Sequence, residues 1–156
     1  MASAQEPPPR DLYAEARNLI AAARSASLAT VSDGAPFAAL VTPAFMPDGA
    51  AILLLSQLSS HTRHLQANPA CALLLVGEPA TDNPQTAPRL CLTGAAAIVP
   101  AADVRAPYLA VHPYAELYVD FADFAFWRIA FTAAHYIGGF AAASRLDVAR
   151  LATSSS

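Results

Sequence analysis

Apolar positions in the first third of the chain are arranged in two ways: at helical spacing, and then in short continuous runs. Across residues 11–24 apolar side chains recur every three or four positions behind Asp11, which predicts an amphipathic helix capped by that aspartate. Short apolar runs follow at residues 26–31, 36–46 and 50–56. They are separated by Asp33-Gly34 and Pro47-Asp48-Gly49, which are turn sequences. These three runs predict strands of an antiparallel meander.

The rest of the chain also predicts strands and short helices. Residues 59–68 predict a short helix that is capped by Ser59 or Ser60 and ended by Pro69, and residues 70–76 a continuous apolar strand. We expect a loop at 77–88, a strand at 89–99, helix at 101–120 with a break at Pro113, and strands at 124–132 and 135–140. Six or seven strands with a few short helices favour a mainly β, α+β barrel over a βαβ array.

The length of 156 residues fits one domain, which we place at residues 11–147. Residues 1–10 are rich in proline, and residues 148–156 end in serines. Both compositions predict tails, with the N-terminal one disordered.

Composition narrows the classes of partner. Charged residues make up 13% of the chain, where about 25% is usual, so much of a lone subunit's surface must be uncharged, as at a buried subunit interface. The net charge is −3 and every cationic residue is arginine, which argues against nucleic acid as a partner. No apolar run is long enough for a membrane span, and no secretion signal precedes residue 11, so we expect a cytoplasmic protein.

Familiar enzyme motifs are missing from the sequence. It contains no GxGxxG, no lysine for a P-loop, no GxSxG and no HExxH, which argues against Rossmann, P-loop and α/β-hydrolase folds. Cys71 and Cys91 lie in apolar runs without metal-ligand spacing and read as small core residues, so no metal site is expected. Asp120 and Asp123 are interpreted as solvated or capping carboxylates rather than as an acid and base pair.

The most informative stretch is residues 56–65, which lie between a predicted strand and a predicted helix. It concentrates hydroxyl groups, His61 and Arg63 where backbone N–H groups at a helix start point outward, a combination that suits a phosphate monoester. The alternative is a helix cap followed by an exposed polar face. The residues alone leave both interpretations open.

A resemblance to a known family rests on an ordered series of motifs across residues 15–143. In chain order they are Ser27-Leu28-Ala29-Thr30-Val31, Gly34-Ala35-Pro36-Phe37-Ala38, Leu55-Ser56, His61-Thr62-Arg63-His64-Leu65, Asn68-Pro69-Ala70, Leu73-Leu74-Leu75, Pro88-Arg89-Leu90, Thr93-Gly94, Tyr108-Leu109, His112-Pro113, Asp120-Phe121-Ala122-Asp123-Phe124, Trp127-Arg128 and Tyr136-Ile137-Gly138-Gly139-Phe140. This series resembles the pyridoxamine 5′-phosphate oxidase-like, FMN-binding split-barrel superfamily, and within it the haem-utilisation branch.

The resemblance implies a six-stranded antiparallel split β-barrel that forms a homodimer with two FMN sites between the subunits. Carried onto this sequence, it implies that the flavin phosphate lies near the start of the helix at 59–68 and the ring beside the strands, with Arg89 reaching across the dimer. The implied cofactor-binding residues are Ala29, Thr30, Val41, Thr42, Ser56, Ser59, Ser60, His61, Thr62, Arg63, Arg89 and Trp127. No catalytic residue is assigned.

Three departures from the family pattern keep the function open. Ser60-His61 replaces the usual Arg-Lys pair at the phosphate, and the Arg-x-His pair that grips the B6 substrate is missing near the C-terminus. Haem-degrading relatives take an iron-ligating histidine from a C-terminal extension, whereas His135 is the last histidine here; it and His112 could ligate iron in principle. Three hypotheses remain: an FMN-dependent oxidoreductase acting on a small molecule, a haem-binding or haem-utilisation protein, and a non-catalytic flavin-binding module.

Overall fold

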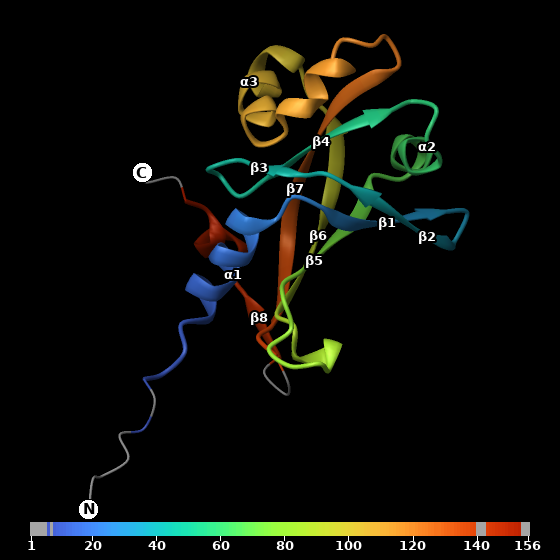
Figure 1. Cartoon of the computed structure of the whole chain (residues 1–156). Helices are drawn as coiled ribbons and strands as arrows, with labels where there is room; N and C mark the ends of the chain where they lie inside the picture. The colour runs from blue at the N-terminus through green and yellow to red at the C-terminus, as the bar shows by residue number, and fades with distance from the viewer. Residues whose placement is uncertain (1–5, 7, 140–142, 154–156) are drawn as a thin grey trace, which may run out of the picture.

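A single antiparallel sheet with three short helices forms the fold (Figure 1). The computed structural model describes residue 6 and residues 8–139 and 143–153. The strands are β1 (Ala26–Ser32), β2 (Ala35–Val41), β3 (Ala44–Phe45), β4 (Ala51–Ser56), β5 (Ala70–Val76), β6 (Arg89–Ile98), β7 (Phe124–Ile137) and β8 (Ala143–Leu146). The helices are α1 (Leu12–Ala22), α2 (Ser60–Ala67) and α3 (Ala101–Val111), with short 3-10 helices η1 (Pro84–Thr86), η2 (Pro113–Leu117) and η3 (Val148–Leu151).

The strand order corrects the predicted meander. The sheet runs β2-β1-β5-β6-β7-β4-β3, with β8 added beside β7. The run predicted as one strand at 36–46 is two strands, β2 and β3, which lie at opposite ends of this order. Pro43 stands between them and cannot donate a ladder hydrogen bond, which explains the interruption. The hairpin turn at Asp33-Gly34 is confirmed, with φ of 49° and 77°. The fold is a split barrel whose sheet is not closed.

The last two predicted strands are one strand, and their separation is also corrected. β7 runs without interruption from Phe124 to Ile137 and carries a bulge where its pairing with β6 shifts between Thr93 and Gly94. Thr132 is the extra residue of this bulge. A Cβ atom on Gly94 would lie 2.0 Å from the carbonyl oxygen of Ala130, so the two backbones approach closely only because residue 94 is glycine.

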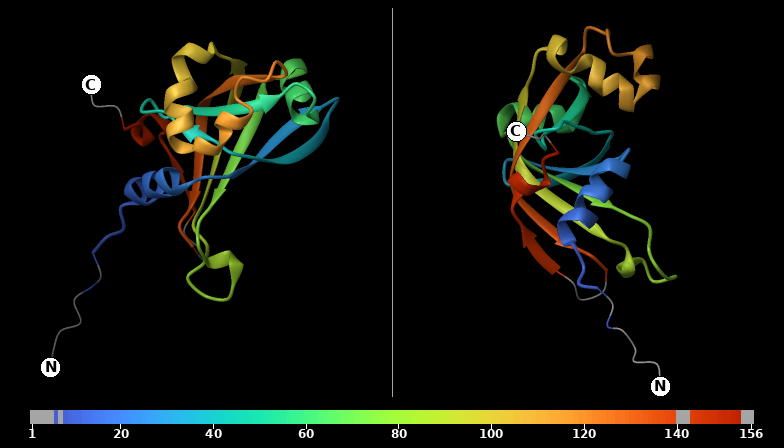
Figure 2. Two further views of the ribbon diagram at one scale, coloured as in Figure 1. Left: turned by 45° about the horizontal axis from the view of Figure 1, so that its top comes forward. Right: turned by 90° about the vertical axis from the view of Figure 1, so that its left-hand side faces the viewer.

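Two apolar clusters cover the two faces of β4. Leu53 and Leu55 lie in the larger cluster beneath α1, whereas Ile52 and Leu54 face α3. α1 lies on one side of the sheet (Figure 2), and its first turn is capped by Asp11, whose Oδ1 accepts from the Ala14 N–H at 3.1 Å. The apolar run of β4 is therefore explained by burial on both faces.

β5 differs from β4, although its sequence is equally apolar. Its burial alternates: Leu73 and Leu75 are buried, whereas Leu74 is 39% and Val76 59% exposed. Side chains in register with Leu74 continue the same outward face across five neighbouring strands. In order from β2 to β7 they are Leu40, Ser27, Leu74, Cys91 and His135. We call this exposed surface of β2, β1, β5, β6 and β7 the outward face.

The C-terminal segment contributes to the core. η3 lies within the stretch 148–156 that the sequence predicted as a tail, yet Leu151 is buried in the larger cluster. The N–H of Thr153 donates to the carbonyl oxygen of Pro47 at 2.8 Å. Residues 1–5, 7 and 154–156, which belong to the predicted tails, lie outside the described residues. Phe140, the last residue of the strand predicted at 135–140, also lies outside them.

Candidate functional site

A groove lies at the opening of the barrel, between the ends of β2 and β4. It encloses about 230 Å³ and is bordered by the start of α2 and the start of β7. Its lining residues are Leu40, Val41, Thr42, Leu54, Leu55, Ser56, Ser59, His61 and Phe124. Five predicted cofactor residues are among them, namely Val41, Thr42, Ser56, Ser59 and His61. We call this site the α2 groove.

Ser56 is held in one orientation at the end of β4. Its hydroxyl donates to Oδ2 of Asp123 at 2.7 Å and accepts from the N–H of Leu58 at 3.2 Å. The carbonyl oxygen of Asp123 accepts from the Gln57 N–H at 2.7 Å, which joins the loop before β7 to the loop after β4. The Ser56 proton is committed to the carboxylate, so toward a ligand this hydroxyl can act only as an acceptor.

The start of α2 departs from the predicted phosphate cradle. Ser59 is the N-cap residue, as one of the two predicted alternatives, but its side chain makes no capping hydrogen bond. Arg63 is exposed, whereas Thr62 is 0% exposed and its hydroxyl has no partner among the described residues. Thr62 therefore faces the interior and does not join Ser59, Ser60 and His61 at the surface.

Histidine and threonine side chains connect α2 to β1. Nδ1 of His64 lies 2.9 Å from the Thr30 hydroxyl, and the His64 ring contacts Phe37 edge-on at 5.1 Å between ring centres. Thr30 is 1% exposed, so in this structure it serves as a buried contact that holds α2 against β1. Burial lowers the pKa of His61, and the nearby His64 lowers it further. His61 is thus held neutral at the edge of the groove.

Other predicted site residues are dispersed. Thr42 borders the groove, and its hydroxyl lies 3.0 Å from that of Tyr108, which donates to the Thr42 carbonyl oxygen at 2.9 Å. Burial raises the pKa of Tyr108 to about 12, so the phenol stays protonated. Ala29 lies on the outward face and does not line the groove. Trp127 is 3% exposed in the larger core cluster and does not line the groove.

Arg89 lies far along the sheet from the α2 groove. It begins β6 and pairs with Val76, the last residue of β5, whereas α2 leads into the first residue of β5. One Nη of Arg89 donates to the carbonyl oxygens of Gln85 and Ala87 at 2.9 and 3.0 Å. The structure therefore does not bring Arg89 to α2 within one subunit.

A second hollow, which the sequence analysis did not find, lies over β6, β7 and β8. It encloses about 390 Å³ and is lined by Cys91, Thr93, Thr132, Ala133, Ala134, His135, Arg145 and Leu146. Cys91, His135 and Arg145 stand in register on three adjacent strands. We call this site the β6–β8 hollow. Strand register could have revealed it, but only with β8 recognised as a strand.

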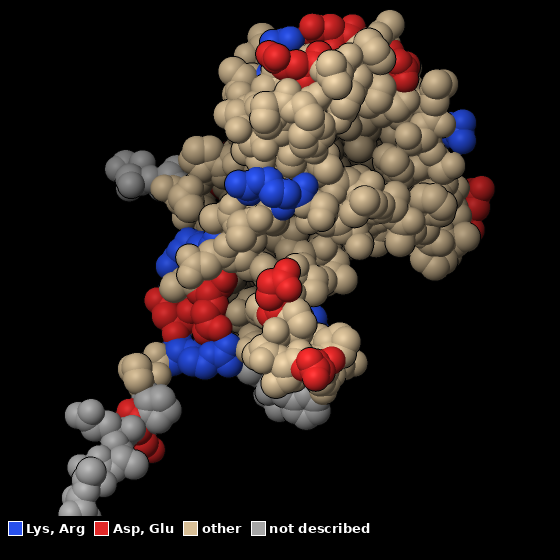
Figure 3. All heavy atoms as spheres, viewed as in Figure 1, with Lys and Arg blue, Asp and Glu red and all other residues tan. Residues whose placement is uncertain are grey.

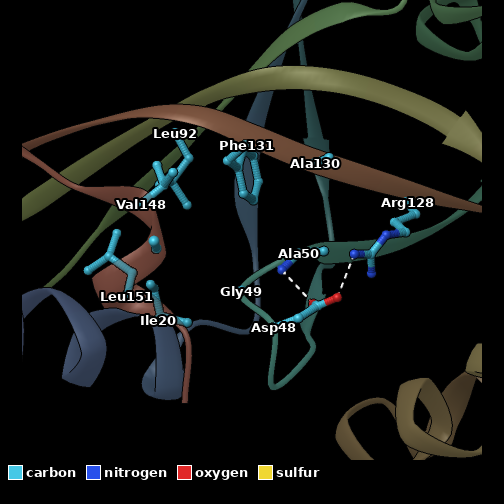
Figure 4. Close-up of a pocket in the computed structure, with 11 residues that line it drawn as sticks. Ile20, Asp48, Gly49, Ala50, Leu92, Arg128, Ala130, Phe131, Val148 and Leu151 are labelled. Carbon is cyan, nitrogen blue, oxygen red and sulfur yellow. Dashed lines mark hydrogen bonds and ion pairs between the residues drawn. The ribbon is translucent and has the colours of Figure 1, made fainter. Parts of the chain in front are cut away.

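A third pocket is lined mainly by apolar residues and contains no predicted site residue (Figure 4). It encloses about 170 Å³ between α1, η3, β7 and the turn before β4. Ile20, Phe131 and Leu151 point into it, and Arg128 forms an ion pair with Asp48 at its mouth. This ion pair keeps the pKa of Asp48 below its usual value. Because the two charges already satisfy each other, the pocket offers no free charged group.

Charge is sparse on the face viewed in Figure 1. Acidic and basic side chains gather around α3 at the top and beside α1 at the lower left, and most of the surface between them is uncharged (Figure 3). In the part of the chain that the structure describes, no helix is long and apolar enough to cross a membrane. Within the same residues, no three His, Cys, Asp or Glu side chains are grouped to hold a metal ion.

Comparison with known families identifies the class of protein. The model of the pyridoxamine 5′-phosphate oxidase family matches residues 12–138, from the first turn of α1 to the end of β7. The chain therefore belongs to this family, as its open antiparallel barrel also indicates.

Several of the most similar proteins are associated with haem. A chloroplast heme oxygenase of Arabidopsis thaliana, HOZ, is 41% identical over 114 residues, which cover 71% of this chain and 34% of that protein. A heme-binding protein from Mycobacterium smegmatis superimposes with a TM-score of 0.85 at 27% identity, over 92% of this chain and 61% of that one. The heme storage protein HutZ of Vibrio cholerae shares the fold, with a TM-score of 0.62 at 18% identity over 79% of this chain and 92% of its own. The chain thus spans about a third of the length of the curated relative.

Proposed function

We propose that this chain is a haem-binding protein of the split-barrel family that works in haem utilisation. The observation that carries this proposal is the 41% identity, over 114 residues, to a protein named as a non-canonical heme oxygenase. Because the chain spans 34% of that protein, the proposal is limited to binding haem and does not include its degradation.

The charges around the α2 groove support haem over a flavin phosphate. A phosphate monoester carries nearly two negative charges and is best held by several cations and N–H donors. Here Thr62 is turned inward, His61 tends to be neutral, and Asp123 places a carboxylate behind Ser56. Arg63 is the remaining cation of the predicted cradle, and it is exposed. These groups would bind a dianionic phosphate only weakly.

FMN in the α2 groove is the second candidate, and one specific observation favours it. The groove gathers Val41, Thr42, Ser56, Ser59 and His61, which the family resemblance independently assigned to the cofactor. Bound there, FMN would supply hydride transfer at its ring, while this chain would bind and shield it. An FMN-dependent oxidation of a small molecule would follow from this candidate.

The outward face supports a homodimer with cofactor sites beside the interface. Leu40 is 76% exposed, Leu74 and Val76 are also exposed, and small residues such as Ala29 and Ala72 lie between them. An uncharged sheet face of this kind favours burial against a second copy. The dimer would associate through β1, β2 and β5. A cytoplasmic location stays a prediction from the sequence.

The test is a parallel titration of the purified full chain with haemin and with FMN. We expect haemin to give a saturable Soret change with a stoichiometry of one per subunit, and FMN to bind more weakly. Light scattering of the same sample should give twice the 16.2 kDa subunit mass. Tight FMN binding without a haemin change would replace the lead proposal with the second candidate.

A further inference from the structure

The β6–β8 hollow places a histidine between a thiol and a guanidinium. Cys91 of β6 pairs with His135 of β7, which pairs with Arg145 of β8. Residues directly opposite in antiparallel strands project to the same side, with Cβ atoms about 4.5–5.5 Å apart. The three side chains therefore form one row on the surface, and that row is the end of the outward face.

The other three histidines are less available to a ligand. His112 is 1% exposed. Its Nε2 lies 2.8 Å from the carbonyl oxygen of Pro43 and must donate to it, because a carbonyl oxygen only accepts. Its Nδ1 lies 3.0 Å from the Tyr114 hydroxyl. His64 uses Nδ1 toward Thr30 and its ring edge against Phe37. His61 is partly buried in the smaller groove.

His135 is free of such commitments. It is exposed, and no hydrogen bond joins its ring to any other residue within 8–139 and 143–153. Both ring nitrogens can therefore reach a ligand. Imidazole is the usual protein ligand of haem iron, so the donor present in this hollow fits the group.

The charges of the hollow suit an anionic ligand. Its lining includes Arg145 and contains no carboxylate among the described residues. The neighbouring floor is made of small side chains, Thr93 and Ala133, beside the exposed Leu74. A guanidinium beside an uncharged, shallow surface fits a flat apolar ring that carries carboxylates.

We propose that His135 is the axial ligand of the haem and that Arg145 pairs with a haem propionate. This inference rests on the proposed haem function and names its site. Haem would supply the iron that the imidazole binds. In this arrangement the ring lies over the end of the outward face, and Cys91 stands beside the histidine without binding the iron. The α2 groove would then be free of haem.

The experiment compares haemin binding by the native protein and four variants. For His135→Ala we expect the dissociation constant to rise about tenfold or more, with loss of the imidazole-ligated ferric spectrum in electron paramagnetic resonance. Added imidazole should restore that spectrum. For Arg145→Gln we expect a rise of about tenfold, consistent with the loss of one charge-assisted contact, and an unchanged ligand signature. His61→Ala, a matched histidine change in the α2 groove, should leave both measurements unchanged.

The outcomes separate the inference from the function on which it rests. If the native protein shows no haem complex, the proposed function fails and the inference with it. If haem binds but His61→Ala rather than His135→Ala removes the imidazole signature, the function stands and this site is wrong. Thiolate ligation in the native protein that disappears in Cys91→Ser would also overturn the assignment to His135. Circular dichroism of each variant checks folding, which substitution of an exposed strand residue should preserve.

Discussion

The α2 groove and the β6–β8 hollow lie on different parts of the same sheet and differ in whether their polar side chains already have hydrogen-bond partners. In the groove, Ser56 is bound to Asp123, and the adjacent His64 is bound to Thr30. In the hollow, His135 and Arg145 have no such partners among the described residues. The groove is therefore preorganised but nearly neutral, whereas the hollow is basic and open. Polar side chains that satisfy one another stabilise the fold, and those left unsatisfied at a surface are available to a ligand.

The largest effect should come from the bulge that shapes the floor of the hollow. Gly94→Ala would place a Cβ atom 2.0 Å from Ala130 O, so the bulge must rearrange. We expect the free energy of unfolding to fall by about 3–4 kcal/mol, measured by urea denaturation. Gly34→Ala is the control: nothing lies within 4 Å of its Cβ position, and only its φ of 77° is unfavourable, at about 1 kcal/mol. Equal effects of the two substitutions would contradict the close approach at Gly94.

The comparison with the sequence shows which features depend on local chemistry. The helix at α1, its Asp11 cap, the Asp33-Gly34 turn and the limits of β5 follow from residues close together in the chain, and the structure confirms them. The predicted meander failed because strand order depends on pairing between distant segments.

The residues of the two sites could be predicted to different degrees, because strand pairing between distant segments also determines which residues meet in a site. Five of the residues that line the α2 groove had been assigned to a cofactor, because the family resemblance implies a cofactor site at these positions. The burial of Thr62 was not expected, because it depends on which side of α2 faces β1, and composition does not show this. The β6–β8 hollow was missed because Cys91, His135 and Arg145 meet only through the register of three strands.

A second prediction concerns the outward face that joins the two regions. Leu74→Glu places a charge in the centre of the proposed interface and, in a dimer, does so twice. We expect the dimer dissociation constant to rise by about a hundredfold or more, measured by analytical ultracentrifugation. Leu58→Glu is the control, because Leu58 is 76% exposed beside α2 and lies off the sheet. A dimer that tolerates Leu74→Glu would place the interface elsewhere.

A third prediction tests whether the α2 groove recognises a phosphate. Removal of one charge-assisted contact costs about 1.5–3 kcal/mol, so Arg63→Ala should weaken FMN binding by roughly ten- to a hundredfold. Riboflavin, which has no phosphate, should bind the native and variant proteins alike. Haemin affinity should not change, since Arg63 is remote from the β6–β8 hollow. If FMN and riboflavin bind the native protein equally, the stretch at Ser59–Arg63 is only the start of a helix.

The smallest effect should come from His61 and appears as a pH dependence. Burial, together with the nearby His64, lowers the pKa of His61 in the folded protein below the value of 6.5 expected for a free side chain. Between these two pKa values the unfolded chain binds more protons, so the free energy of unfolding rises with pH there and levels off above about pH 7. Stability should decline as the pH falls through the free value.

Urea midpoints measured between about pH 5 and pH 8 check this dependence, because carboxylates titrate mostly below that range. Arg10 and Arg128 lower the pKa of Glu15 and Asp48 further, which moves their contributions to still lower pH. His61→Gln should flatten the profile between the two pKa values of His61. If the profile keeps its slope in His61→Gln, the neutral state of His61 is not linked to folding. His61 would then not be a preorganised neutral residue of the groove.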